Sequence, residues 1–125
     1  MADMLVVRGI RGAITVDVDE PDEIIAAARE LVEQMIEVND VDIDMIASVV
    51  FSATPDLTSV FPAVGGREAG LTNVPLFCTT EIDVPGAQPR CLRVLMHVNT
   101  TKNQDEIQHV YLREAVSLRP DLERR

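Results

Sequence analysis

The sequence predicts an α+β protein in which a mixed β-sheet packs against two main helices. Two observations predict this class: several apolar or alternating segments have the period of a strand, and two longer segments open with helix start signals. The chain has 125 residues, of which 46% are hydrophobic and 26% charged, as is typical of a globular protein. Two independent cores would each fall below the usual size, so we expect a single domain over residues 1–125.

The first half of the chain is predicted to hold a strand, a long helix and a second strand. Residues 4–16 are rich in β-branched and apolar residues, and Gly9 and Gly12 within them indicate a bulge or a close approach of the backbone. A helix is predicted to begin at Pro21, because proline suits the first helical position and apolar residues follow at helical spacing. Residues 45–53 form an apolar run that is typical of a buried strand.

Two short helices and a strand are predicted next. Thr54-Pro55 is a helix start signal, which predicts a short helix through Val60. A further short helix is predicted over residues 63–70, although two consecutive glycines weaken it. Residues 74–84 are predicted to form a strand, which ends at a turn marked by Pro85-Gly86.

The last third is predicted to contain a strand, a helix and a short strand. Residues 90–100 alternate strictly, which puts four side chains on one face of the strand: Cys91, Arg93, Leu95 and His97. Residues 103–113 are predicted to form the second main helix, since acidic residues stand near its start. Residues 115–118 are predicted to form a short final strand.

Charge and composition exclude several functional classes. The formal net charge of −10 and the 3% of aromatic residues, with no Trp, argue against nucleic acid as a partner. No apolar run approaches the roughly 20 residues that span a bilayer, and the first residues lack the pattern of a signal peptide. Cys78 and Cys91 have no metal-type spacing, and neither do His97 and His109. We therefore expect a cytoplasmic protein with reduced cysteines, no metal and no membrane partner.

Three features of the sequence are compatible with an anion site. Arg8 and Arg11 lie three apart in a strand, so one of them points to each face. Glu81 lies in an otherwise apolar predicted strand, and Arg93 stands in the middle of another. Each would need a partner if buried, but each also fits an exposed sheet face, so the residues alone leave both interpretations open.

Seven short motifs follow one another over nearly the whole chain. They are Arg8-Gly-Ile-Arg-Gly-Ala13, Ser52-Ala-Thr-Pro-Asp-Leu57, Val60-Phe-Pro-Ala63 with Arg67-Glu68, Cys78 to Glu81 with Asp83, Cys91-Leu-Arg93-Val94, His109-Val-Tyr-Leu112 and Leu118-Arg-Pro-Asp-Leu122. In this order they resemble the small α/β, AroH-class chorismate mutases. The resemblance implies a chorismate-mutase-like, ferredoxin-like fold, three copies of which form a trimeric pseudo-α/β-barrel. It also implies the cofactor-free conversion of chorismate to prephenate, in clefts between the subunits of a homotrimer.

The resemblance also implies a set of site residues. Arg93 would contact the ether oxygen and a carboxylate of the substrate, and Glu81 would accept a hydrogen bond from the ring hydroxyl. The substrate-binding positions that it implies are Arg11, Phe61, Arg67, Phe77, Cys78, Thr79, Thr80, Tyr111 and Arg119. Cys78 and Glu81 lie three apart, so a regular strand would not point both side chains into one pocket. We therefore expect one of three geometries: the strand bulges, the strand ends near Thr80, or one of the two residues contributes mainly backbone contacts.

Two other functions remain compatible with these residues. One is a Rid-type imine or enamine hydrolase, which also places an arginine between subunits to hold a carboxylate. The other is a trimer that binds a metabolite without turnover, to which Val64 points slightly because the resembled family often has a lysine there.

Overall fold

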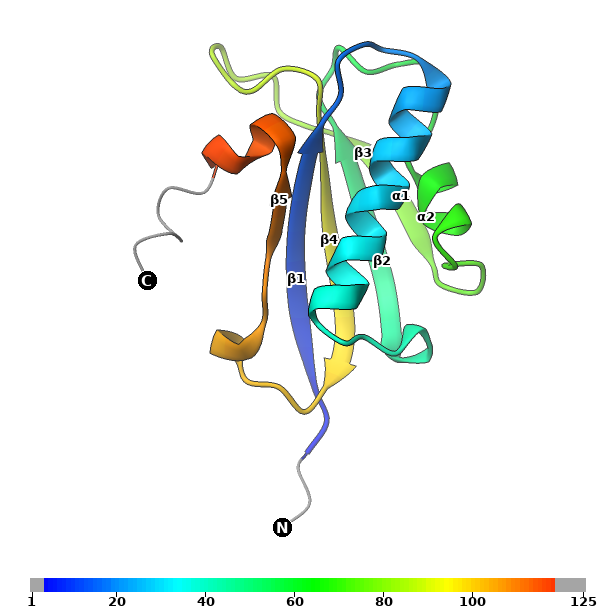
Figure 1. Cartoon of the computed structure of the whole chain (residues 1–125), viewed down its shortest axis with the longest axis vertical. Coiled ribbons are helices and arrows are strands. Elements are labelled where there is room, and N and C mark those ends of the chain that lie inside the picture. The colour runs from blue at the N-terminus through cyan, green and yellow to red at the C-terminus, as the bar shows by residue number, and fades with distance from the viewer. Residues whose placement is uncertain (1–3, 119–125) are drawn as a thin grey trace.

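The computed structural model of the chain describes residues 4–118, which form a five-stranded mixed sheet with helices against it (Figure 1). The elements are β1 (Val6–Thr15), α1 (Pro21–Val38), β2 (Ile46–Ala53), α2 (Ala63–Glu68), β3 (Leu76–Thr80), β4 (Cys91–Thr100) and β5 (Val110–Leu112). The strand order is β3-β2-β4-β1-β5; β4 pairs antiparallel with β1 and β2, whereas β3 and β5 join in parallel. The predicted α+β class with a mixed sheet is confirmed.

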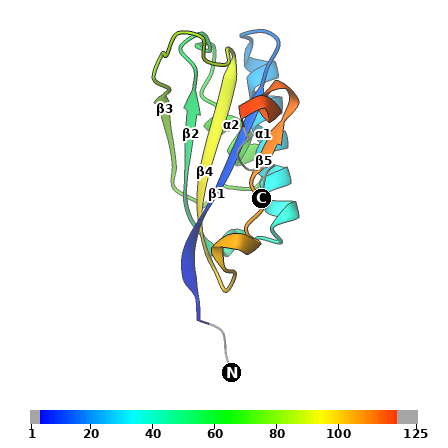
Figure 2. The ribbon, with the colours of Figure 1, turned by 90° about the vertical axis from the view of Figure 1, so that its left-hand side faces the viewer.

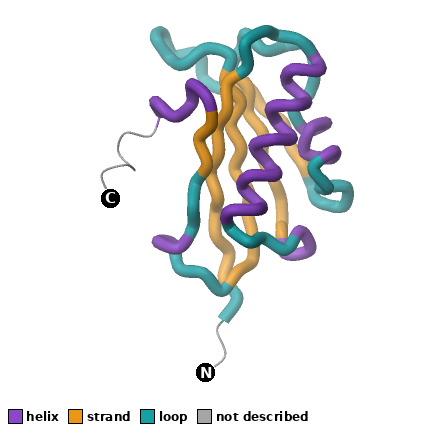
Figure 3. The backbone as a smooth tube through the Cα atoms, viewed as in Figure 1, coloured by secondary structure: helices purple, strands orange, loops and turns teal. Residues whose placement is uncertain are grey.

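Both α-helices lie on the same face of the sheet, as the views in Figures 2 and 3 show. The buried stripe of α1 consists of Ile24, Ala27, Ala28, Leu31, Val32 and Met35. It packs on the apolar residues of β1, β2 and β4 that point to that face. The opposite face carries neither α1 nor α2, and we call it the helix-free face. No helix within residues 4–118 is long and apolar enough to cross a membrane.

Two glycines allow close packing of α1, one against β1 and one against α2. A Cβ added at Gly12 would lie 2.6 Å from the sulfur of Met35, so a larger residue there would push α1 off β1. The pairing of β1 with β4 runs unbroken through Gly9 and Gly12, so close approach, and not a bulge, explains the glycine at position 12. A Cβ at Gly65 would collide with the carbonyl oxygen of Ile25, which explains how α2 packs against α1.

The helix predicted from Thr54 through Val60 is wrong, because this segment forms turns and bends. Its backbone groups bind to other parts of the chain. The N–H of Thr54 donates to the carbonyl of Cys91 at 3.0 Å, and the N–H groups of Thr58 and Ser59 donate to the carboxylate of Asp19. These tertiary partners replace the hydrogen bonds that a helix would have made.

The helix predicted over residues 103–113 is also wrong. A single 3₁₀ turn forms at Gln104–Glu106, after which the chain extends into β5. The buried amide of Asn39 bonds both backbone groups of Gln108, at 2.8 Å each, and so holds the chain extended before β5. The second helix of the fold is therefore the short α2, within the segment 63–70 for which a short helix was predicted.

Two predicted strands differ from the structure. Residues 115–118 belong to a 3₁₀ helix, Arg113–Leu118, whose start is fixed where the N–H of Glu114 donates to the hydroxyl of Thr15 at 3.2 Å. The strand predicted over 74–84 is shorter and ends at Thr80. Beyond it the chain leaves the sheet and reaches the turn that was predicted at Pro85-Gly86.

Candidate active site

One row of cross-strand neighbours forms the floor of the candidate site on the helix-free face. From β3 to β5 the row is Thr79, Ser52, Arg93, Ala13 and Tyr111, one residue from each strand. Side chains two apart on a strand share a face, so Arg11 lies on this face as well. Glu81 follows the same alternation from Thr79, because its N–H still donates to the carbonyl of Ala53 at 2.9 Å.

The row and its neighbours line a hollow of about 270 Å³, which we call the sheet hollow. Its charged and hydroxyl-bearing lining residues are Arg11, Ser52, Thr79, Glu81, Arg93 and Tyr111. Five of these six were predicted as site residues. The six come from all five strands, and Glu81 directly follows the end of β3. With two guanidinium groups and one carboxylate, the hollow suits an anion that carries its own hydrogen-bonding groups.

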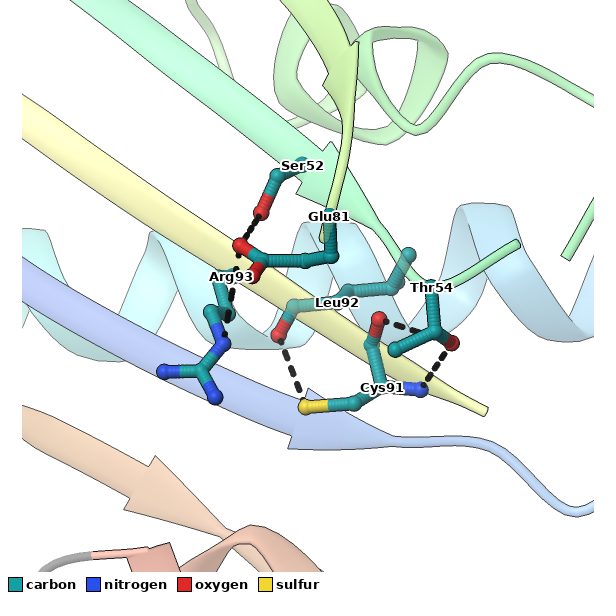
Figure 4. Close-up of polar contacts among 6 residues, drawn as sticks. All are labelled: Ser52, Thr54, Glu81, Cys91, Leu92 and Arg93. Atoms are coloured by element: carbon teal, nitrogen blue, oxygen red, sulfur yellow. Dashed lines mark hydrogen bonds and ion pairs between the residues drawn. The ribbon is translucent and has the colours of Figure 1, made fainter. Parts of the chain in front are cut away.

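Glu81, Arg93 and Ser52 form the polar centre of the sheet hollow (Figure 4). The hydroxyl of Ser52 donates to Oε1 of Glu81 at 2.5 Å. The same oxygen lies 3.6 Å from Nε of Arg93, which is close enough for an ion pair and too far for a hydrogen bond. Nε of Arg93 is buried, and within residues 4–118 no hydrogen bond reaches it. The structure thus holds a fixed carboxylate beside an unused N–H donor.

Arg11 is the second guanidinium of the hollow. Its backbone N–H donates to Nδ1 of His109 at 2.9 Å, which ties β1 to the segment that precedes β5. Its side chain is exposed, and no ion pair within residues 4–118 engages it. The guanidinium is therefore available to a carboxylate from outside the chain.

A second and larger hollow, of about 580 Å³, lies between residues 53–62 and β3. We call it the loop hollow; it is mainly apolar, and Phe61, Cys78, Thr79 and Thr80 among the predicted residues line it. Thr79 lines both hollows, so they adjoin one another across β3.

Cys78 and Glu81 lie on opposite faces of the sheet. Cys78 packs against the core on the face that carries the helices, whereas Glu81 points to the helix-free face. The strand ends at Thr80, which was one of the three geometries expected for this segment. Arg67, on α2, and Phe77, on β3, are exposed and line neither hollow. Arg119 lies outside the described residues.

Comparison with known proteins identifies the family. The sequence profile described as "Chorismate mutase type I" matches residues 7–122. Chorismate mutase AroH of Thermus thermophilus is 53% identical over 118 residues, which cover 94% of this chain and 97% of the relative. The chain belongs to the type I chorismate mutase family. Chorismate mutase AroH of Bacillus subtilis (strain 168) is 46% identical over 119 residues, or 94% of each chain.

A solved structure agrees with this assignment to the chorismate mutase family. The chorismate mutase from Clostridium thermocellum superposes with a TM-score of 0.86 at 45% identity, and the match covers 88% of this chain and 98% of that one. The resemblance to the AroH class that the sequence indicated is thereby confirmed. None of these matches supports the Rid-type alternative.

Ser52 is the member of the sheet hollow that the sequence did not reveal as a site residue. It is 8% exposed and stands in a strand that is otherwise almost entirely apolar. The available signal was this single hydroxyl between Phe51 and Ala53, both of which face the core. This hydroxyl alone did not predict a site residue, because only the pairing of β2 with β3 and β4 brings it next to Glu81.

Cys91 lies next to the sheet hollow but is not a reactive thiol. It is 1% exposed and packs with Ala13 and Ala115. Burial raises the pKa of the Cys91 thiol above its ordinary value; Arg93 opposes this and Glu81 adds to it. At neutral pH the thiol is therefore protonated, and the side chain acts as a small apolar group that packs next to Arg93. Within residues 4–118 no cluster of three His, Cys, Asp or Glu side chains is placed to hold a metal ion.

Asp19 fixes the wall of the loop hollow. Its carboxylate accepts hydrogen bonds from both N–H groups of Thr58 and Ser59 and from the hydroxyl of Thr58, at 3.1 to 3.2 Å. Hydrogen bonds, first the one with the Ser59 side chain, hold the pKa of Asp19 below its ordinary value of 3.8, against an opposing effect of desolvation. Phe61 stands two residues beyond this clamp, so Asp19 helps to place it.

Replacing Asp19 by Asn tests the clamp through its pH dependence. A carboxyl whose pKa is lowered in the folded state stabilises that state fully above its unfolded pKa, and loses the effect as the pH falls through the folded pKa. We expect Asp19→Asn to unfold at a lower denaturant concentration than the wild type at neutral pH. This gap between the two unfolding midpoints should shrink only below pH 3.8. Denaturant titrations over a pH series measure the gap, with the exposed Asp17→Asn as control. A gap of constant size down to acid pH would contradict the clamp.

Proposed function

We propose that this protein converts chorismate to prephenate in the sheet hollow, without a cofactor. Membership in the type I chorismate mutase family supports the proposal. The observation in the structure that carries it is the buried Nε–H of Arg93, which lacks a hydrogen-bond partner within residues 4–118 and lies beside a fixed carboxylate. A buried donor without a partner is costly, so its presence is best explained by a ligand atom that accepts from it.

The substrate and the sheet hollow are chemically complementary. Chorismate carries two carboxylates, a ring hydroxyl and an ether oxygen. Arg11 would hold one carboxylate through its fork of N–H groups, and Tyr111 would hydrogen-bond a carboxylate as well. Glu81 would accept the hydrogen bond of the ring hydroxyl through the oxygen that Ser52 leaves unoccupied.

Arg93 would act on the chemical step itself. The reaction is an intramolecular rearrangement in which the C–O bond of the ether breaks while a C–C bond forms, and no proton is transferred. Negative charge develops on the ether oxygen as its bond to the ring lengthens, and positive charge develops on the ring. Arg93 would stabilise the first and the Glu81 carboxylate the second. Holding the substrate in its compact, reactive conformer supplies a further part of the acceleration.

A homotrimer forms the second part of the proposal. Among residues 4–118, the sheet hollow is lined by the arginines and by no aromatic side chain apart from Tyr111, whereas the loop hollow is lined by Phe61 and by no arginine. The helix-free face also exposes apolar side chains, namely Val7, Phe77 and Leu95, that a neighbouring subunit would cover. In the trimer the loop hollow of one subunit would adjoin the sheet hollow of the next, with Cys78, Thr79 and Thr80 near the shared cleft and Arg67 and Arg119 near its mouth.

A cytoplasmic role in phenylalanine and tyrosine biosynthesis completes the proposal. The absence of a cofactor remains a prediction, and it fits a step that needs neither a nucleophile nor a general base.

The direct test is turnover of chorismate by the purified protein. We expect loss of the ultraviolet absorbance of chorismate and formation of prephenate without any added cofactor. We also expect kcat to stay nearly constant from about pH 6 to 9, because no group transfers a proton. Tight binding of chorismate without any turnover would instead support the metabolite-binding trimer.

Equilibrium sedimentation tests the trimer. We expect a single species with three times the mass of the 13.8 kDa chain at micromolar concentration. A monomer that turns over chorismate at full rate would refute the shared cleft, because Phe61 and the arginines would then act within one chain.

Exchanging Arg93 for lysine tests the role of the guanidinium. An ammonium carries the charge but has no fork of N–H groups, so we expect Arg93→Lys to fold normally and to lose roughly 100- to 1,000-fold in kcat. The matched control is Arg29→Lys, since Arg29 lies on α1 and forms an exposed ion pair with Glu33. Near wild-type turnover of Arg93→Lys would contradict the proposed role of Arg93.

A further inference from the structure

We infer that Ser52 is a positioning residue, which holds the Glu81 carboxylate away from Arg93 so that both side chains stay available to the substrate. The inference rests on the proposed function and deepens it. It adds to the same site a residue that would act through Glu81 and would not itself contact the ether oxygen or the carboxylates of the substrate.

The first step is the position of Ser52 in the sheet. It is the cross-strand neighbour of Arg93 on one side and of Thr79 on the other, so its hydroxyl lies between the arginine and the segment that carries Glu81. The residue is 8% exposed, and its hydroxyl donates to Oε1 of Glu81 at 2.5 Å. A buried hydroxyl bound to a carboxylate restricts that carboxylate more strongly than a solvated one does.

The second step is the competition for one oxygen. Oε1 of Glu81 accepts from Ser52 and also faces Nε of Arg93, at 3.6 Å (Figure 4). A movement of about half an ångström would bring Nε within hydrogen-bonding distance and close the ion pair. The bond from Ser52 occupies one acceptor position of this oxygen and holds the carboxylate short of that contact. The arginine therefore keeps a free N–H, and the glutamate keeps its second oxygen.

The third step is the consequence for the substrate. In a closed pair, the Nε–H of Arg93 would be bound to Glu81, so the enzyme would have to break a charge-assisted hydrogen bond before it could stabilise the ether oxygen. Arg93 is needed most as charge develops on that oxygen. The loss of the Ser52 hydroxyl should therefore lower kcat more than it raises KM.

The backbone at Glu81 does not depend on the Ser52 hydroxyl. The N–H of Glu81 donates to the carbonyl of Ala53 at 2.9 Å, which extends the pairing of β2 with β3 by one residue. Removing the hydroxyl therefore frees the carboxylate and leaves the chain at Glu81 in place. This separation allows the effect on positioning to be measured in a folded protein.

Kinetics of Ser52→Ala give the first measurement. We expect kcat/KM to fall roughly 10- to 100-fold, which is the range for losing a hydrogen bond to a charged group, with most of the fall in kcat. Ser52→Thr keeps the hydroxyl and should recover most of the loss. Ser48→Ala is the matched control, because Ser48 lies on the same strand and bonds His97 at 3.1 Å, outside the hollow; its kinetics should match the wild type. Equal loss in Ser52→Thr and Ser52→Ala would overturn the inference.

A double-mutant cycle separates positioning from a general structural role. If Ser52 acts through Glu81, then Ser52→Ala should change kcat little in a Glu81→Gln background. The same fold-loss in both backgrounds would mean that Ser52 acts independently of Glu81, which would overturn the inference. A Glu81→Gln variant with full activity would refute the site under the proposed function instead.

A crystal structure of Ser52→Ala tests the geometry without reference to activity. We expect Oε1 of Glu81 to move to within about 3.0 Å of Nε of Arg93, the distance of a direct hydrogen bond. An unchanged gap of 3.6 Å in the variant would overturn the inference, whether or not the protein turns over chorismate.

Discussion

The register of the sheet is the constraint on which the site depends. Five strands contribute one residue each to the row that runs from Thr79 through Arg93 to Tyr111, although these residues are far apart in the sequence. A slip of one residue in any pairing would turn the side chains of that strand to the opposite face. The ten-residue pairing of β1 with β4 and the tight contact between Gly12 and α1 hold the central strands against such a slip. The site is therefore a direct product of strand pairing.

The sheet separates the acidic part of the chain from the arginines of the site. The segment 17–44 holds eleven of the 21 acidic residues and a single base, Arg29, so it accounts for the whole net charge of −10. Most of this segment is α1, which lies behind the sheet as seen from the helix-free face. Arg11 and Arg93 therefore face an incoming anion, and Glu81 is the one acid of the described part of the chain that lines the sheet hollow. A strongly acidic protein can in this way keep a site that suits a dianion.

Local patterns predicted those elements that depend on local interactions. The long helix from Pro21 and the alternating strand around Arg93 were both evident, since periodicity and a start signal suffice for them. The segment 103–113 has a genuine start signal, because the N–H of Asn103 bonds the side chain of Glu106, yet the amide of Asn39 far away in the sequence extends the chain. The same holds for the site. The charged residues Glu81 and Arg93 could be predicted from residue type and position, whereas their contacts with each other and with Ser52 depend on how the strands pair.

A neutral donor is well suited to keep an acid and an arginine apart. The side chains of Arg93 and Glu81 are 42% and 31% exposed, and an ion pair with that much solvent contributes only about 0 to 1 kcal/mol. A hydrogen bond from a buried hydroxyl to a carboxylate contributes about 1.5 to 3 kcal/mol, so the serine, more than the arginine, fixes the position of the shared oxygen. A lysine or a further arginine in place of Ser52 would hold the carboxylate as well, but its added charge would bind the substrate and the product alike. The hydroxyl fixes the carboxylate and leaves the charge of the hollow unchanged, so the stabilisation by Arg93 remains available for the moment at which charge develops.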